Sequence, residues 1–192
     1  MHGRVPVVAA VERRRQLPRG TDVGVARQDV GELVRVLQVH ARQSQVGEAR
    51  GGGPGPVLVL GIDPGTAVTG YGVVARRGVG AVSLVECGVV RTSAGTPLAE
   101  RIREIYLEVD ALLERHRPFA MSGENVFQGK NVHSALTLGH ARGVILLAGA
   151  LRGVPIAEYA PREIKKAVVG TGDATKDQVA FMVKQQLRLQ AA

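Results

Sequence analysis

The sequence predicts an α/β fold, a mixed five-stranded sheet flanked by helices. Short segments rich in Val and Gly fill residues 57–92, helical spacing of apolar residues begins near residue 97, and strand-like and helix-like segments alternate after it. Strands that are joined through helices pair in parallel with right-handed crossovers, whereas closely spaced strands form antiparallel hairpins. The predicted order of elements is therefore β-β-β-α-β-α-β-α-α.

The first three predicted strands form a meander. Residues 57–63 are an apolar run that ends in Asp63 and is closed by a Pro-Gly turn. The segments 68–76 and 81–92 are rich in Val and Gly and are separated by an Arg-Gly pair, which favours a hairpin. A carboxylate is thus expected at the end of the first strand, beside a turn.

Strands and helices alternate in the second half of the chain. Residues 97–116 have the apolar spacing of a helix with one buried face, which Pro118 ends. Residues 119–127 and 154–159 are expected to be the fourth and fifth strands. Between them, Ser134 to Arg152 predicts a helix whose three glycines permit close packing against a neighbour.

Two shorter helices are expected to complete the fold. Pro161 suits the first turn of a short helix, because its missing N–H would have no helical partner at that position. Asp173 or Thr175 can cap a final helix that runs from Lys176 towards Leu189.

Residues 1–56 differ in composition from the rest of the chain. They contain nine Arg and no Lys, and they end in a run of Gly and Pro that is typical of a linker. We expect this segment to be disordered, or to be an upstream extension that does not belong to the domain. Residues 57–192 are then expected to form one domain.

The composition narrows the possible partners and the compartment. A net charge of +8 and a pI near 10.4 favour an anionic partner, of which nucleic acid is the first candidate. The single cysteine, Cys87, excludes an internal disulfide and a cysteine-cluster zinc site. The longest apolar run, Val144 to Leu151, is far shorter than the roughly 20 residues of a membrane span, and no secretory signal is evident. We therefore expect a cytoplasmic protein without a membrane partner.

The segment Gly61–Thr66 carries the first chemical signal, a carboxylate at a strand end beside a turn that lets a phosphate approach the backbone. Taken alone it is ambiguous. Sugar kinases and actin-like ATPases place a similar Asp-x-Gly-Thr at a strand end, and an Asp before Pro-Gly is often only a turn former.

Four ordered motifs resolve this ambiguity. They are Gly61–Gly72 (GIDPGTAVTGYG), Glu124–Asn131 (ENVFQGKN), Ser134–Gly143 (SALTLGHARG) and Pro161–Gly172 (PREIKKAVVGTG). With them, residues 57–190 resemble the RuvC family of bacterial Holliday-junction resolvases. The resemblance implies a ribonuclease-H-like fold and a magnesium-dependent endonuclease that nicks four-way DNA junctions symmetrically during recombination and repair. It also implies a homodimer and the branch-migration complex RuvA–RuvB as a partner.

The resemblance implies roles for four residues in catalysis. Asp63 and Glu124 match two of the four acidic residues that bind magnesium in the family, and Lys165 and Lys176 match basic positions of its active site. Two adjacent carboxylates repel each other, and a divalent cation relieves that repulsion. Hard oxygen ligands suit Mg²⁺, which keeps several of its waters.

Five further residues are expected to contact DNA. Phe127 matches a phenylalanine that stacks on bases near the crossover in the family, an interaction that tolerates any base sequence. The other four are basic residues of the same half of the chain, namely Lys130, Arg142, Arg162 and Lys166. For the basic residues, a merely solvated charged face is the alternative interpretation.

Two features depart from the family. Ser122 and Gly123 stand where an apolar strand is expected before Glu124, and glycine inside a strand weakens it. The family also has two further aspartates in a later helix, whereas no carboxylate side chain follows Asp177 here. We therefore expect a domain truncated at its C-terminus, without its last helix, that folds incompletely and cuts poorly. The alternatives are a junction-binding fragment without activity, a related nuclease of RNA maturation, and an actin-like phosphotransferase.

Overall fold

The computed structural model describes residues 56–77, 81–125 and 132–187. The predicted N-terminal segment 1–56 lies outside these ranges apart from Pro56. Within them the elements follow the predicted order: β1 (Val57–Asp63), β2 (Val68–Arg77), β3 (Ala81–Arg91), α3 (Leu98–His116), β4 (Ala120–Glu124), α4 (Val132–Leu151), β5 (Ile156–Tyr159), α5 (Pro161–Val169) and α6 (Lys176–Gln186).

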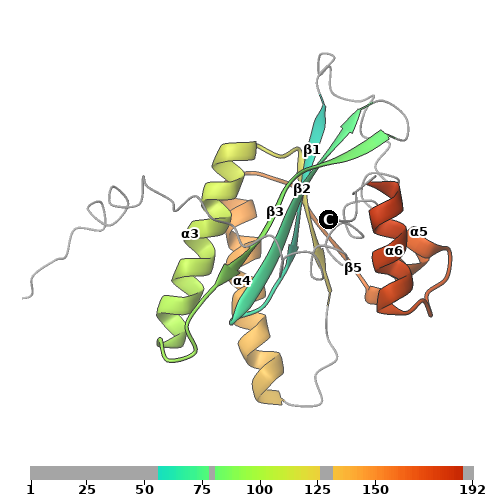
Figure 1. Ribbon diagram of the computed structural model, residues 1–192. Helices are drawn as coiled ribbons and strands as arrows, with labels where there is room; N and C mark the ends of the chain where they lie inside the picture. The colour runs from blue at the N-terminus through green and yellow to red at the C-terminus, as the bar shows by residue number, and fades with distance from the viewer. Residues whose placement is uncertain (1–55, 78–80, 126–131, 188–192) are drawn as a thin grey trace, which may run out of the picture.

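The five strands form one mixed sheet in the order β3-β2-β1-β4-β5 (Figure 1). Strands β1, β2 and β3 pair antiparallel as a meander, and β4 pairs in parallel with both β1 and β5. The expected five-stranded sheet is confirmed. Strand β4 ends at Glu124, before the predicted end at 127, and residues 126–131 lie outside the described ranges. Strand β5 begins at Ile156, after Pro155, whose nitrogen has no hydrogen to donate to a neighbouring strand.

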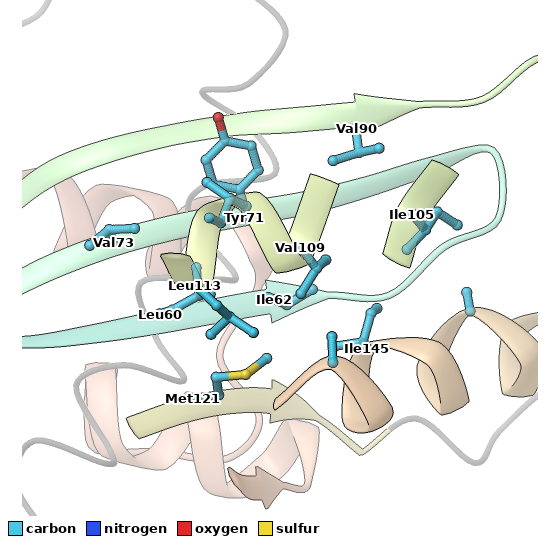
Figure 2. Packing of buried hydrophobic residues seen from close by; sticks show 13 residues of the cluster. Leu60, Ile62, Tyr71, Val73, Val90, Ile105, Val109, Leu113, Met121 and Ile145 are labelled. Carbon is cyan, nitrogen blue, oxygen red and sulfur yellow. The ribbon is translucent and has the colours of Figure 1, made fainter. Parts of the chain in front are cut away.

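Helices cover both faces of the sheet, α3 and α4 on one and α5 and α6 on the other (Figure 1). The first face carries the main core, in which Leu60, Ile62 and Val73 pack with Ile105, Val109 and Ile145 (Figure 2). All of these side chains are at most 6% exposed. The alternation of side chains along β1 and β2 therefore decides which residues face α3 and α4.

The second face is covered through a smaller apolar cluster of α5 and α6. Its buried members are Val168, Ala174, Val179, Val183 and Leu187, and they pack against Val82, Leu84 and Cys87 of β3. The same two residues, Val82 and Leu84, also contact Val59 and Val74 on this face of β1 and β2. Helices α5 and α6 therefore lie on the face of β1 that carries Val59.

The helix ends follow local chemistry. Arg117 adopts a left-handed conformation with φ of 44° immediately before Pro118, which ends α3 as predicted. Thr175, one of the two predicted caps, begins α6 by accepting a hydrogen bond from the Gln178 amide, and the Gln178 side chain accepts one from the Thr175 amide. At the start of α5, the Glu163 carboxylate accepts from the Ala160 amide at 2.8 Å.

Helix α4 buries only part of its surface. Its buried residues are Ala141, Ile145, Ala148 and Gly149. By length and composition, α4 is the one helix in the described part of the chain that could span a membrane, which the expectation based on continuous apolar runs missed. Helix α4 packs on the sheet through Ile145 and forms an ion pair with β5.

Candidate active site

Asp63 and Glu124 occupy neighbouring positions at the carboxyl ends of two adjacent parallel strands, β1 and β4. Strands β1 and β4 are parallel, and their register pairs Ile62 with Gly123, so the next residue of each strand is one of the two carboxylates. Because side chains alternate along a strand, both carboxylates belong to the same face as Val59, the face on which α5 and α6 lie. The predicted pairing of the two acids on adjacent strand ends is thus compatible with the register.

Two buried threonines hold the turn that follows Asp63. The Thr69 hydroxyl donates to the Gly65 carbonyl at 2.6 Å and lies 3.4 Å from the Gly65 amide. The Thr92 hydroxyl donates to the Thr66 carbonyl and accepts from Arg101 Nε at 3.0 Å. Neither threonine was singled out from the sequence. The hydrogen bond from the Thr92 hydroxyl joins residues that only the sheet brings together, 26 positions apart.

Gly65 is required in this turn for steric reasons. A Cβ atom added to it would overlap the Val68 carbonyl oxygen, which belongs to the backbone and cannot move away cheaply. The Pro-Gly sequence after Asp63 therefore sets the path of the chain immediately beyond the carboxylate.

Two polar residues, Ser122 within β4 and Asn125 immediately after it, are near Glu124 in the chain. The Asn125 amide donates to the Tyr159 carbonyl at 2.9 Å, and Glu124 is paired with Tyr159 in the sheet register. Ser122 Oγ and Asn125 Oδ1 are buried and accept or donate no hydrogen bond within the described part of the chain. Asn125 Oδ1 is a carbonyl oxygen without a hydrogen-bond partner, one residue from Glu124.

The donor set fits a hard divalent cation. The two carboxylates offer hard oxygen ligands, which Mg²⁺ accepts while retaining waters. No group of three or more His, Cys, Asp or Glu residues that could hold a metal occurs within the described ranges. The arrangement therefore fits a cation bound partly by waters or substrate, and does not fit a tetrahedral zinc site.

The predicted basic residues after β5 lie on α5 and α6, which cover the face of the two carboxylates. Lys165 is half-buried on α5, whereas Lys166 and Lys176, the first residue of α6, are exposed. Arg162 pairs with Asp173 at 3.0 Å, and both side chains are about 80% exposed. Such a pair is open to solvent and contributes little to stability, so it leaves Arg162 available to a phosphate.

Arg142 lies on α4, on the other face of the sheet from the two carboxylates. Its guanidinium donates to both carboxylate oxygens of Glu158 on β5, at 2.6 and 2.5 Å. Glu158 is paired with Gly123 in the sheet, one residue before the Glu124–Tyr159 pair, so it faces the α3 and α4 side. The hydrogen bonds to Glu158 raise the pKa of Arg142 above its ordinary value. Phe127 and Lys130 lie outside the described residues.

Tyr159 is a neighbour of Glu124 that the sequence did not single out. The two residues are paired between β4 and β5, and α5 begins two residues after Tyr159. Burial raises the pKa of the Tyr159 hydroxyl, and the Glu163 carboxylate adds to the effect. A tyrosine at the end of a short strand gives no separate signal in the sequence, because its importance depends on which strand lies beside it.

Comparison with known proteins settles the family. The model of the family described as crossover junction endodeoxyribonuclease RuvC matches residues 59–192. The chain belongs to this family. The RuvC protein of Pelotomaculum thermopropionicum is 49% identical over 133 residues, which are 69% of this chain and 80% of that protein. The RuvC protein of Brevibacillus brevis is 47% identical over 131 residues, 68% of this chain and 78% of that protein.

A solved structure shows the same fold. Thermus thermophilus RuvC in complex with a Holliday-junction substrate superposes with a TM-score of 0.68 at 39% identity, over 71% of this chain and 82% of that chain. The RuvC family is a nuclease family, so the resemblance drawn from the four motifs is confirmed. The ambiguity of the Gly61–Thr66 segment is thereby resolved in favour of a nuclease over a phosphotransferase.

Proposed function

We propose that this RuvC-family chain is a magnesium-dependent endonuclease that nicks four-way DNA junctions symmetrically during recombination and repair in the cytoplasm. The observation that carries the proposal is the register of β1 and β4, which gives Asp63 and Glu124 neighbouring positions on one face of the sheet. The net charge of +8 suits a DNA partner. The RuvC relative that was solved with a Holliday-junction substrate supports the choice of substrate.

In this proposal, Asp63 and Glu124 bind Mg²⁺, and waters and substrate oxygens supply its remaining ligands. When bound, the cation activates water and stabilises the leaving oxygen of a phosphodiester. The two carboxylates would hold the cation, which would then orient the scissile phosphate, and the turn held by Thr69 and Thr92 limits the movement of Asp63.

The basic residues have the complementary role. Lys165 and Lys176 neutralise charge on the phosphate that is being cut, from helices on the carboxylate face. Lys130, Arg162 and Lys166 contact other phosphates, and Phe127 stacks on a base near the crossover. Phosphate contacts position the DNA without selecting a base sequence, so selectivity for junctions arises from the placement of two active sites.

We propose a homodimer that forms through α4. Its exposed residues Leu136, Gly139, Gly143, Leu147 and Leu151 recur every three or four positions and so lie on one side of the helix. We call this set the outer stripe of α4. Leu136 and Leu151 are 61% and 64% exposed, and a Cβ added to Gly139 or Gly143 would meet no other atom within 4 Å.

An apolar stripe with two glycines permits close approach of a second helix, and the same surface on a second copy completes a two-fold interface. The amino-terminal part of α4 extends beyond the sheet, which leaves this surface accessible (Figure 1). A two-fold dimer presents one active site to each of two equivalent strands of a junction. A RuvA–RuvB complex is the proposed partner that supplies such junctions.

The test is cleavage of a synthetic four-way junction in Mg²⁺, with a linear duplex of the same arm sequence as control. We expect paired nicks in the junction, none in the duplex, and loss of nicking in Asp63→Asn and Glu124→Gln with junction binding retained. Lys165→Ala should slow cutting, and Phe127→Ala should impair junction processing more than duplex affinity.

A second candidate function is junction binding without cutting. It is favoured by the finding that the described residues include no group of three metal-ligating side chains. The same assay distinguishes the two candidates. Tight junction binding with no Mg²⁺-dependent nicks in the parent chain would replace the endonuclease proposal with this one.

A further inference from the structure

The ion pair between Arg142 and Glu158 lies on the α4 face of the sheet, opposite to the face of the candidate active site. Arg142 belongs to α4 and Glu158 to β5, and the two side chains are joined by two hydrogen bonds of 2.6 and 2.5 Å. Their side chains are 29% and 23% exposed, so the pair is largely shielded from water. A bidentate guanidinium–carboxylate pair of this kind fixes the relative orientation of the two elements that it joins.

The sheet register relates this pair to Glu124. Glu158 is opposite Gly123, and the next pair along the same two strands is Tyr159 with Glu124. The ion pair is therefore on the α4 side of the sheet, one residue from the carboxylate on the other side. Any tilt of β5 relative to α4 moves the end of β4, because the Asn125 amide is bonded to the Tyr159 carbonyl at 2.9 Å.

Gly123 explains why an ion pair is needed here. A side chain at this position would face α4 and help to hold the end of β4 by packing. Glycine has none, and a Cβ built there would meet only the Ile62 carbonyl oxygen, at 3.7 Å. The contact between α4 and this end of the sheet is instead made one strand further along, by Arg142 and Glu158.

We propose that Arg142 and Glu158 are positioning residues of the active site, which hold the ends of β4 and β5 against α4 and so orient Glu124 for metal binding. This inference rests on the proposed function. It also replaces the expectation that Arg142 contacts DNA. Since α4 also carries the outer stripe, the same pair connects the proposed dimer helix to the carboxylate edge of the sheet.

The test compares Glu158→Gln and Arg142→Lys with the double variant Arg142→Glu/Glu158→Arg. We expect each single variant to slow single-turnover cutting by about 10–100-fold, as outer-shell changes at metal sites do, and to raise the Mg²⁺ concentration for half-maximal rate. Junction affinity should stay near that of the parent. The double variant should recover part of the lost rate, since the ion pair is restored with opposite polarity.

The matched control is Asp110→Asn. It removes the carboxylate of a similar pair, in which Arg152, immediately after α4, donates to Asp110 of α3 at 2.6 and 2.7 Å, away from the active site. This variant should lose a similar amount of thermal stability and cut at the parental rate. The proposal would be overturned if Arg142→Ala weakened junction binding while Glu158→Gln changed neither binding nor cutting. That result would assign Arg142 to DNA contact.

A second measurement does not depend on cutting. Amide hydrogen exchange at Asn125 should be faster in Glu158→Gln than in the parent, and unchanged in Asp110→Asn, because only the first variant loosens β5 beneath the Asn125–Tyr159 hydrogen bond. A parent chain that does not cut refutes the proposed function, whereas unchanged exchange at Asn125 refutes the positioning role.

Discussion

At the scale of single residues, two hydroxyl groups decide how firmly Asp63 is held. Thr69 is fully buried and Thr92 is 9% exposed, and each donates to a carbonyl of the turn after β1. A buried carbonyl that loses its donor keeps the full cost of its lost hydration. The position of Asp63 therefore depends on a side chain from β2 and on one from the residue that follows β3.

We expect Thr69→Val to reduce the free energy of unfolding by about 1–3 kcal/mol, since the shape is retained while the Gly65 carbonyl loses its donor. Junction cutting should fall with it, because the turn after Asp63 becomes less constrained. Denaturant unfolding and single-turnover cleavage measure the two effects. Thr137→Val is the control, since its hydroxyl makes a solvent-exposed hydrogen bond to the His133 carbonyl within α4. Equal losses in both variants would contradict this account.

Tyr71 makes the protein sensitive to alkaline pH. Its hydroxyl donates to Glu86 at 3.0 Å, and Glu86 also binds Arg115 at 2.6 Å and His116 at 2.8 Å. Burial, followed by the charge of Glu86 and their hydrogen bond, raises the pKa of Tyr71 from 10 to about 12. The neutral phenol is thus favoured in the folded state.

Folding stability from Tyr71 is complete below the unfolded pKa of 10 and is lost as the pH rises towards the folded pKa of about 12. We expect the free energy of unfolding to decrease across this window, by on the order of 2 kcal/mol from this group. Tyr71→Phe should be less stable at neutral pH but lack this part of the alkaline decrease. Denaturant unfolding at a series of pH values measures it, and an identical decrease in the variant would assign the effect to other groups.

At the scale of elements, helix α4 has two sides with different requirements for glycine. Gly149 packs on the sheet, and a Cβ there would lie 2.6 Å from Ile156 Cδ1 and 2.8 Å from Met121 Sδ. Gly139 is on the outer stripe, where an added Cβ meets nothing within 4 Å. Close packing of α4 on β4 and β5 therefore depends on the first glycine and not on the second.

We expect Gly149→Ala to destabilise the fold by about 1–3 kcal/mol through overpacking, although alanine is the better helix former. Gly139→Ala should stabilise the isolated subunit by up to about 1 kcal/mol, since only helix propensity changes. Denaturant unfolding at low protein concentration distinguishes them. Stabilisation by both substitutions would show that the side chains of Ile156 and Met121 move aside without cost.

At the scale of the whole molecule, the dimer proposed to form through the outer stripe of α4 would link association to cutting. A symmetric junction has two equivalent strands to cut, so one subunit per strand requires a two-fold dimer. The outer stripe of α4 is apolar, so its burial between two copies would favour association. The net charge of +8 makes two copies repel each other, so association without such a specific contact is disfavoured.

Leu147→Glu should convert the proposed dimer to a monomer, because Leu147 is 50% exposed on the outer stripe and a buried glutamate in a two-fold interface would face its own copy. Light scattering measures the mass, and paired nicking of a junction should become single nicking. Leu107→Glu on α3, at a position that is 36% exposed, should leave both unchanged. A Leu147→Glu chain that remains dimeric would locate the interface elsewhere.

The sequence by itself determined the order of elements and the residues at their ends. The apolar run before Asp63 and the helical spacing of residues 97–116 depend on neighbours in the chain, so local periodicity predicted both. The four motifs likewise predicted the family, which is confirmed. Asp63 and Glu124 as its acidic pair stay a prediction, with which the register of β1 and β4 is compatible. Thr175 and Pro161 were also predictable, because capping and first-turn preferences act within one helical turn.

Only the tertiary structure decided which side chain meets which. The pairing of Arg142 with Glu158 depends on how α4 crosses β5, and the role of Thr92 depends on the register between β2 and β3. The membrane-like composition of α4 likewise takes its meaning from Ile145 and Gly149, which pack on the sheet and leave the outer stripe uncovered. These contacts join residues far apart in the chain, and a sequence pattern carries no information on the side of a sheet to which a distant helix returns.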